Sequence, residues 1–286
     1  MTKKLPSPVI ATYNLKGIFG ILNITADSFS DGGQYLEPRK AIAHIEKLLL
    51  DGADHIDIGA VSSSPGGIDI DSRTEIERIR PIFEKYSGQL DMLSIDTYNP
   101  DTQSFFIDLG IGWLNDIQGF QHPHILEKLT DSDCRLVIMH SVQSVGRADH
   151  TDYNPRLLMD KITRFFDEKL NQISKYSIDK NRLVIDPGMG FFLGVNPECS
   201  FTVIRELEKL KDFGVDIMLS VSKKSFIRNV SGLDTADVFP ANLCTEILCC
   251  LQGANYIRTH EVTNLLSSKK ILDYYFGKNL DTARRS

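Results

Sequence analysis

Short apolar runs rich in β-branched residues alternate along this chain with longer stretches of helical periodicity. Eight such runs occur, and several are apolar almost throughout, as is typical of parallel strands that are covered on both faces. The runs are Ile18–Ile24, His55–Ala60, Met92–Thr97, Trp113–Ile117, Arg135–His140, Arg182–Pro187, Asp216–Ser222 and Tyr256–His260. This order favours a strand–helix unit that is repeated along the chain.

The segments between the runs have the spacing of helices that pack by one face. Between residues 162 and 173, apolar side chains recur three and four positions apart. They are Ile162, Phe165, Phe166, Leu170 and Ile173. Gly52, Gly110 and Gly214 stand between a helical segment and the next run, where a left-handed helix cap favours glycine.

Strand–helix alternation repeated eight times predicts an α/β protein that is a single (β/α)8 TIM barrel. We expect one domain over residues 1–286, with the barrel proper at about residues 17–278. Residues 1–16 precede the first strand and are predicted to form a short N-terminal extension that closes the bottom of the barrel. A doubly wound open sheet is the alternative that the same alternation leaves open.

Composition and charge exclude several classes of function. The formal net charge is -6, which argues against nonspecific nucleic-acid binding, since such binding relies on Lys and Arg beside phosphates. The five cysteines form no CxxC pair, which indicates free thiols in a reducing compartment. Neither a signal peptide nor an apolar run long enough to span a membrane is evident, so we expect a cytoplasmic protein.

Polar residues stand at the C-terminal end of every predicted strand, where a barrel of this kind performs its chemistry. They include Asn23, Asp96, Asn115, His140, Asp186, Lys224, Arg258 and His260. Carboxylates and amides suit a flat heterocycle with many N–H groups, whereas Lys, Arg and His suit an anion such as phosphate. The direction of Asp57 and the role of His140 stay open, with a structural role favoured for His140.

Several of these segments resemble the signatures of the dihydropteroate synthase family. Residues 20–33 and 186–191 carry the most specific resemblance, and four further segments follow the family pattern in order. The four are Ile95–Thr97, Asn115–Ile117, Ser222–Ser225 and Arg258–His260. The resemblance covers nearly the whole chain and implies a pterin-binding barrel that joins 6-hydroxymethyl-7,8-dihydropterin pyrophosphate to p-aminobenzoate.

The resemblance implies a role for each matching residue. The pterin pocket would contain Asp96, Asn115, Asp186, Lys224 and Arg258. The pyrophosphate would contact Asn23, Ser63, Arg258 and His260, with Asn23 also holding Mg2+. The p-aminobenzoate would contact Ser63, Ser64, Pro65, Phe191, Lys224 and Ser225. The residues expected to carry catalysis are Asp96, Lys224, Arg258 and His260. The family also suggests a homodimer.

The chain departs from the common family pattern near the predicted aminobenzoate pocket. Ser63-Ser64 replaces a usual Thr-Arg pair, Ala26 replaces a usual proline, and residues 189–194 read Met-Gly-Phe-Phe-Leu-Gly. These features resemble the sulfonamide-resistant synthases carried on mobile elements, or a chromosomal relative of them. We therefore expect sulfonamides to compete poorly with p-aminobenzoate.

Three other functions fit a barrel with this rim. A methyltetrahydrofolate-dependent corrinoid methyltransferase would share the barrel and the pterin pocket but would not need the pyrophosphate grip of Arg258 and His260. A non-catalytic pterin-binding protein would bind ligand without releasing pyrophosphate. A generic phosphate-binding isomerase or aldolase is disfavoured, because no Lys stands inside a predicted strand where a Schiff base would need it.

Overall fold

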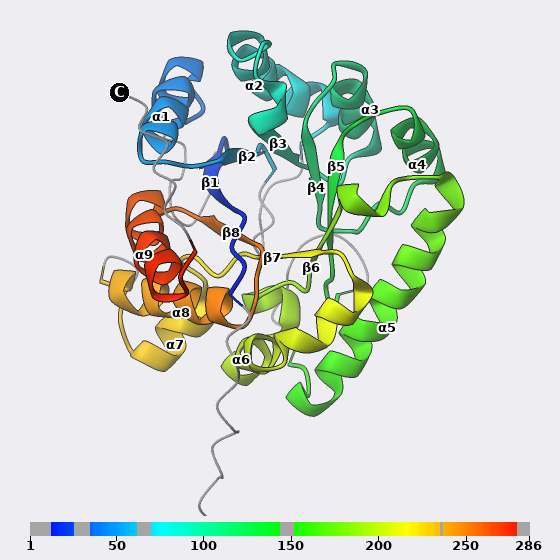
Figure 1. Ribbon diagram of the computed structural model, residues 1–286. Coiled ribbons are helices and arrows are strands. Elements are labelled where there is room, and N and C mark those ends of the chain that lie inside the picture. The colour runs from blue at the N-terminus through cyan, green and yellow to red at the C-terminus, as the bar shows by residue number, and fades with distance from the viewer. Residues whose placement is uncertain (1–12, 26–34, 62–69, 144–151, 235–236, 279–286) are drawn as a thin grey trace, which may run out of the picture.

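Eight parallel strands form a closed barrel in the computed structural model, and helices surround it (Figure 1). The structure describes residues 13–25, 35–61, 70–143, 152–234 and 237–278. Each strand pairs with the next along the chain, and β8 pairs with β1. The strands are β1 (Gly17–Asn23), β2 (His55–Gly59), β3 (Leu93–Asp96), β4 (Trp113–Asp116), β5 (Arg135–Met139), β6 (Leu183–Asp186), β7 (Asp216–Leu219) and β8 (Tyr256–Thr259). The predicted TIM barrel is confirmed, and the open-sheet alternative is wrong.

The α-helices are α1 (Pro38–Leu50), α2 (Ser72–Lys85), α3 (Pro100–Asp108), α4 (Pro123–Thr130), α5 (Pro155–Ile173), α6 (Pro197–Arg205), α7 (Ser225–Ser231), α8 (Phe239–Leu251) and α9 (Val262–Tyr275). Short 3-10 helices are η1 (Leu90–Met92), η2 (Ser174–Tyr176), η3 (Lys180–Arg182), η4 (Gly190–Leu193) and η5 (Leu207–Phe213). Several helices begin with proline, whose fixed φ suits the first helical position. Asn99, Asn154 and Asn196 cap α3, α5 and α6, since each side-chain oxygen accepts a backbone N–H two residues on.

The strands after β1 are shorter than the apolar runs that predicted them. Met92 and Arg182 belong to η1 and η3, and β7 ends at Leu219 rather than at Ser222. At the C-terminal ends, side chains take over the backbone hydrogen bonds of the ladder. Asp186, for example, accepts the N–H of Gly188 at 2.8 Å, which turns the chain away from the sheet. The three predicted glycine caps are confirmed, with φ of 96°, 79° and 63° at Gly52, Gly110 and Gly214.

Side chains alternate between the helices and the barrel interior along each strand. In β2, Ile56 and Ile58 face the helices and pack in the main hydrophobic core, as Leu93 and Ile95 do in β3. The lower interior of the barrel holds a separate cluster: Phe19, Trp113, Val137, Val184, Met218 and Tyr256. The alternate positions nearer the C-terminal ends are polar, so the interior is apolar below and polar above.

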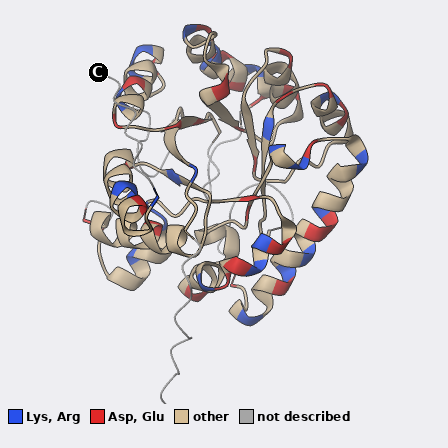
Figure 2. Ribbon diagram, viewed as in Figure 1, with Lys and Arg blue, Asp and Glu red and all other residues tan. Residues whose placement is uncertain are grey.

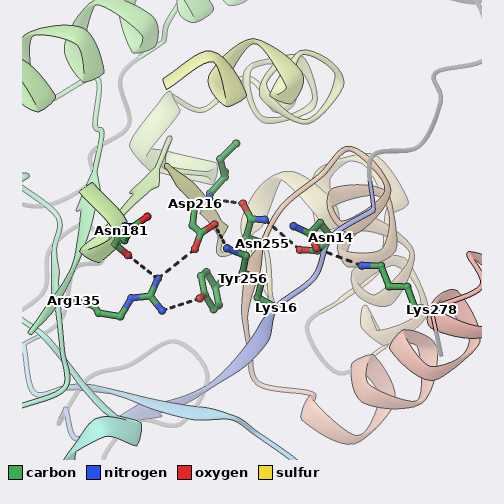
Figure 3. A network of polar contacts seen from close by, with 9 residues as sticks. Asn14, Lys16, Arg135, Asn181, Asp216, Asn255, Tyr256 and Lys278 are labelled. Atoms are coloured by element: carbon green, nitrogen blue, oxygen red, sulfur yellow. Dashed lines mark hydrogen bonds and ion pairs between the residues drawn. The ribbon is translucent and has the colours of Figure 1, made fainter. Parts of the chain in front are cut away.

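A polar network closes the bottom of the barrel (Figure 3). The guanidinium of Arg135 stacks on Trp113, 4.2 Å from the ring centroid, and donates to the hydroxyl of Tyr256 at 2.9 Å. Asp216 joins Arg135 at 3.3 Å and Lys16 at 2.6 Å. Lys16 belongs to residues 13–16, the described part of the N-terminal extension, so this segment is tied to the face opposite the polar rim.

Most charged residues lie outside the strands (Figure 2), and each strand from β2 to β8 carries one charged residue. Within the described ranges, no helix is long and apolar enough to cross a membrane. The strand charges Arg135 and Asp216 belong to the network at the bottom, whereas Asp57, Asp96, Asp186 and Arg258 lie toward the strand ends that the next subsection describes.

Gly112 precedes β4 at a point where two backbones meet too closely for a side chain. Its N–H donates to Leu90 at 2.9 Å, and a Cβ there would lie 2.6 Å from the Cα of Asp91. We predict that Gly112→Ala lowers the free energy of unfolding by about 2 kcal/mol, because η1 must move to relieve the overlap. Urea denaturation measures the loss.

Gly88→Ala is the matched control, because a Cβ at Gly88 meets no described atom within 4 Å. This variant should be neutral or slightly stabilising, by at most about 1 kcal/mol, since alanine restricts the unfolded chain. Equal losses for the two variants would contradict the close contact at Gly112.

Candidate active site

Polar side chains at the C-terminal ends of β1, β3 and β4 lie at one level of the barrel. The strand register pairs Asn23 with Gly59, Gly59 with Asp96, and Asp96 with Asn115. Gly59 leaves space between its neighbours, because a Cβ there would lie 3.6 Å from Asn23 Oδ1 and 3.8 Å from Asp96 Oδ2. The register thus brings these predicted site residues together around one side of the mouth.

Arg258 reaches across the barrel from β8 and joins two carboxylates. Its Nη2 donates to Asp96 Oδ2 at 2.7 Å, and its Nε contacts Asp57. Asp57 is fully buried and also accepts hydrogen bonds from Ser94 Oγ at 2.5 Å and Asn115 Nδ2 at 3.3 Å. Although burial disfavours its charge, the pKa of Arg258 is raised by the nearby carboxylates.

Asp96 and Asn115 each offer acceptor atoms toward the mouth. Burial raises the pKa of the Asp96 carboxyl to about 7, and the Arg258 guanidinium opposes that rise. The Oδ1 atom of Asn115 is buried and has no hydrogen-bond partner among the described residues. A buried acceptor of this kind requires a partner, such as a donor group on a ligand.

Asp186 and Lys224 form the opposite side of the mouth. Burial raises the pKa of the Asp186 carboxyl, while the Lys224 ammonium acts against the rise. Burial lowers the pKa of Lys224 to about 8, and the carboxylate of Asp186 opposes that fall. Lys224 Nζ also donates to the carbonyl of Met189 at 3.0 Å, which holds the amine over η4.

His260 and Ser222 connect the ends of β8 and β7. The backbone N–H of His260 donates to Ser222 Oγ at 3.1 Å, and its Nδ1 lies 2.9 Å from the same oxygen. Burial and the cations around it, Lys223 and Arg258 first among them, lower the pKa of His260 well below its usual range. Without a bound anion, the neutral imidazole is therefore favoured, and in that form His260 can donate a hydrogen bond to an anion.

An apolar rim lies beside these charges. Ile117, Met139 and Phe192 form a small cluster, with Tyr98 and Phe191 packed against it. The ammonium of Lys224 lies 5.1 Å from the ring centroid of Phe192, in a cation–π geometry. Such a rim suits the flat apolar faces of a heterocycle whose edges meet the polar groups.

The remaining predicted residues fall into two groups. Ser225 begins α7 directly after Lys224, and Phe191 lies in η4, so both are close to the mouth in sequence and structure. Ser63, Ser64 and Pro65 lie outside the described residues, as does Ala26. His140 is buried beside Phe165, and its Nδ1 lies 3.0 Å from the carbonyl of Pro187, which fits the structural role favoured from the sequence.

Asn23 supplies an amide oxygen at the mouth, a ligand type that Mg2+ accepts. Within the described ranges, no group of three His, Cys, Asp or Glu residues is arranged to hold a metal ion. A magnesium ion that keeps water and phosphate oxygens as its other ligands fits a single protein ligand of this kind. The donor set therefore suits a metal that arrives on a phosphorylated substrate rather than one caged by the protein.

Together, the site has three acids and an amide deep in the barrel, a lysine of lowered pKa, an arginine and a histidine. This set can bind a polar heterocycle at depth and an anion nearer the entrance, and it can stabilise both signs of charge as a bond between them breaks. The fold and the site thus define a barrel enzyme that acts on a heterocyclic anion.

Comparison with known proteins agrees with this class. Residues 19–260 match the family described as pterin binding enzyme. The Escherichia coli dihydropteroate synthase type-3 is 42% identical over 89% of this chain and 97% of its own length. The Yersinia pestis dihydropteroate synthase, solved with a sulfonamide drug, has a TM-score of 0.85 at 28% identity and covers 92% of this chain and 95% of its own. The Xanthomonas albilineans enzyme, solved with 4-aminobenzoic acid, has a TM-score of 0.82 at 28% identity, with 93% and 94% covered.

This chain belongs to the dihydropteroate synthase family of pterin-binding enzymes, as its sequence signatures predicted. It is an enzyme of folate synthesis with the TIM barrel of that family.

Asp57 is the site residue whose role the sequence left open. It faces into the barrel and holds Arg258, Ser94 and Asn115 at once. The signal was present in its neighbours: Ile56 and Ile58 must face the helices, so the residue between them faces inward.

We predict that Asp57→Ala lowers the free energy of unfolding by about 2 kcal/mol or more, because Arg258 loses one of its two buried carboxylate partners. Chemical denaturation at pH 7.5 measures the loss. Glu206→Ala is the control, since it breaks an exposed ion pair with Lys209 and should change stability by less than about 0.5 kcal/mol. Similar small losses for both variants would show that the buried pair adds little.

Proposed function

We propose that this protein joins 6-hydroxymethyl-7,8-dihydropterin pyrophosphate to p-aminobenzoate, with release of pyrophosphate and formation of 7,8-dihydropteroate. One observation carries the proposal: Asp96, Asp186, Lys224 and Arg258 meet at one barrel mouth although they come from four separate strand ends. The Asp186 carboxylate interacts electrostatically with Arg258 and Lys224, and the Asp96 carboxylate interacts with the same two cations from the other side of the mouth. A corrinoid methyltransferase would share the deep acids but would not need the pyrophosphate grip of Arg258 and His260, and a silent binding protein would bind ligand without releasing pyrophosphate.

The deep acceptors are proposed to recognise the pterin by its N–H edge. Asp96, Asn115 and Asp186 supply carboxylate and amide oxygens, and the unpartnered Oδ1 of Asn115 is one acceptor that a ring N–H can meet. Lys224 donates to the ring carbonyl or nitrogen, and the guanidinium of Arg258 lies against the ring.

The pyrophosphate is proposed to lie nearer the entrance, against Arg258, His260, Asn23 and Ser63. The guanidinium of Arg258 and the neutral imidazole of His260 donate hydrogen bonds to phosphate oxygens. Asn23 is the proposed ligand of Mg2+, which neutralises pyrophosphate charge when bound. Ser63, which follows β2 in the sequence, would contact the same group.

The charges favour a dissociative route, in which the C–O bond to pyrophosphate breaks before the new bond forms. The pyrophosphate leaves with the electron pair, and Arg258 and His260 stabilise its growing negative charge. Asp96 and Asp186 stabilise the positive charge that spreads over the pterin methylene. The amine of p-aminobenzoate then bonds to that carbon and gives its proton to water, so no strong protein base is required.

The aminobenzoate is proposed to bind among Phe191, Ser225, the stem of Lys224 and the residues Ser63, Ser64 and Pro65. Residues 190–193 form η4 beside Lys224, so the Phe191–Gly194 segment shapes this pocket. We propose that this segment, together with Ser63 and Ser64, makes sulfonamides weak competitors of p-aminobenzoate.

A homodimer is proposed from an exposed apolar surface on α7, α8 and α9. Ile271, Tyr274 and Tyr275 share one face of α9 and are 71%, 77% and 78% exposed, and α8 packs between α7 and α9 with Leu248 40% exposed. A patch of this kind fits a self-complementary contact between two copies.

We propose a cytoplasmic location, which the five free thiols support, since Cys244 is exposed and would oxidise readily outside a reducing compartment.

We predict that the parent protein releases pyrophosphate when mixed with dihydropterin pyrophosphate, p-aminobenzoate and Mg2+. Asp96→Asn and Lys224→Ala should each lower turnover by roughly two orders of magnitude or more, because each removes a charge that interacts with the reacting group. Circular dichroism checks that both variants keep the fold. Near-normal rates in both would rule out the assignment, and a sulfonamide that inhibits at concentrations comparable to the aminobenzoate KM would rule out the proposed resistance.

The pKa values of Asp96 and Lys224 predict a narrow bell-shaped dependence of kcat/KM on pH. The acid limb should rise through about 7 as Asp96 loses its proton, and the basic limb should fall through about 8 as Lys224 loses its own. Lys224→Arg keeps its charge at high pH, so its residual activity should lack the basic limb. A flat profile of the parent from pH 7.5 to 10 would show that Lys224 does not need its charge.

A further inference from the structure

The turn that carries Lys224 has an unusual backbone conformation. Lys223 has φ of 58°, in the left-handed region that residues with a side chain seldom adopt. The N–H of Lys224 donates to the carbonyl of Val221 at 3.2 Å and closes the turn. A positive φ at the third position is the mark of a type II turn, where glycine is usual.

Asn242 of α8 supports this turn from outside the site. The N–H of Lys223, which such a turn leaves unpaired, donates to Asn242 Oδ1 at 2.7 Å. Asn242 is buried, 1% exposed, and belongs to the helix layer rather than to the barrel mouth. The neighbouring residue of the turn, Ser222, binds His260 through two contacts, so the turn determines where two site residues lie.

Glu246 stands four residues after Asn242, on the same face of α8, and is completely buried. Burial raises the pKa of its carboxyl to about 7, and the nearby side chains of Thr259 and Asn242 oppose the rise. No hydrogen bond joins Glu246 to Asn242, because both carboxylate oxygens of Glu246 and the Nδ2 of Asn242 lack a partner among the described residues. Thr259 in turn lies 3.5 Å from Ser222, measured between the two hydroxyl oxygens. The buried face of α8 therefore connects with the turn at Lys223 and with the end of β8.

We propose that Asn242 is a positioning residue for the synthase reaction: it holds Lys223 in the left-handed conformation and so fixes Lys224 and His260 at the site. The inference rests on the proposed function, because it concerns the same lysine and histidine. Without Asn242, the N–H of Lys223 loses its partner and the turn relaxes toward conformations that suit an L-residue. Lys224 then moves relative to Asp186 and Met189, and small displacements of such a group have large effects on rate.

The test measures steady-state kinetics of Asn242→Ala with dihydropterin pyrophosphate and p-aminobenzoate. We expect kcat to fall about tenfold or more, since a buried N–H is left unpaired and a charged group is displaced, with KM for either substrate changed less than about threefold. Thr245→Val is the matched control, because it removes a buried hydroxyl of the same helix whose one hydrogen bond among the described residues is to Ala241, within α8. It should retain parental kinetics.

Rescue by glycine separates positioning from loss of packing. Glycine adopts a positive φ without a supporting hydrogen bond, so Asn242→Ala should lower kcat less than about threefold when introduced into the Lys223→Gly protein. An equal fractional loss in both backgrounds, or a parent-like Asn242→Ala enzyme, would overturn the proposal. If Asn242→Ala does not fold, Asn242→Leu, which fills the space but accepts no hydrogen bond, is held to the same expectations.

The parent protein distinguishes this inference from the proposed function. A parent that releases no pyrophosphate from these substrates would refute the function itself. An active parent whose Asn242 variants behave like the Thr245→Val control would refute only the role of Asn242.

Discussion

Inside the barrel, the guanidinium of Arg258 lies between the carboxylates of Asp57 and Asp96, and the rest of the site is arranged around this contact. Removing three charged groups from water costs free energy unless each group keeps its partners. The surrounding strands must therefore hold the three groups at fixed distances. The closed sheet does this, since its register fixes Asp96 beside Asn115, and Asn115 donates to Asp57. The same burial shifts the pKa values of Asp96 and Lys224 toward neutral pH, where a bound substrate can change the protonation of either group.

The barrel achieves this by dividing its interior into two halves. Aromatic and aliphatic side chains fill the lower half, and the network of Arg135, Asp216 and Lys16 closes it (Figure 3). Water is thus excluded from below, so the charges of the upper half interact in a medium of low polarity and open only toward the mouth. The proposed reaction brings a pyrophosphate and a developing cation into one space, and this division permits both.

The periodicity of apolar residues in the sequence predicts most of the fold. Apolar runs such as Leu136–Ile138 predict strands because both sheet faces are covered, and the glycines at positions 52, 110 and 214 mark helix ends because only they adopt a positive φ cheaply. The strand ends were predicted less well, because residues such as Asp186 fold back onto the backbone and end the ladder early. Strand polarity also identified Asp96, Asn115 and Asp186, since a barrel gathers its C-terminal ends at one rim.

The sequence by itself determined that polar residues stand at the strand ends, because the apolar runs and the residues that follow them are local properties of the chain. Only the tertiary structure decided which of these residues touch: that Arg258 joins Asp57 as well as Asp96, and that His260 contacts Ser222. Asn242 shows the limit most clearly, since nothing in the helical pattern of α8 distinguishes it from a core position. Its contact with Lys223 depends on how a helix packs against a turn 19 residues earlier, which no local pattern records.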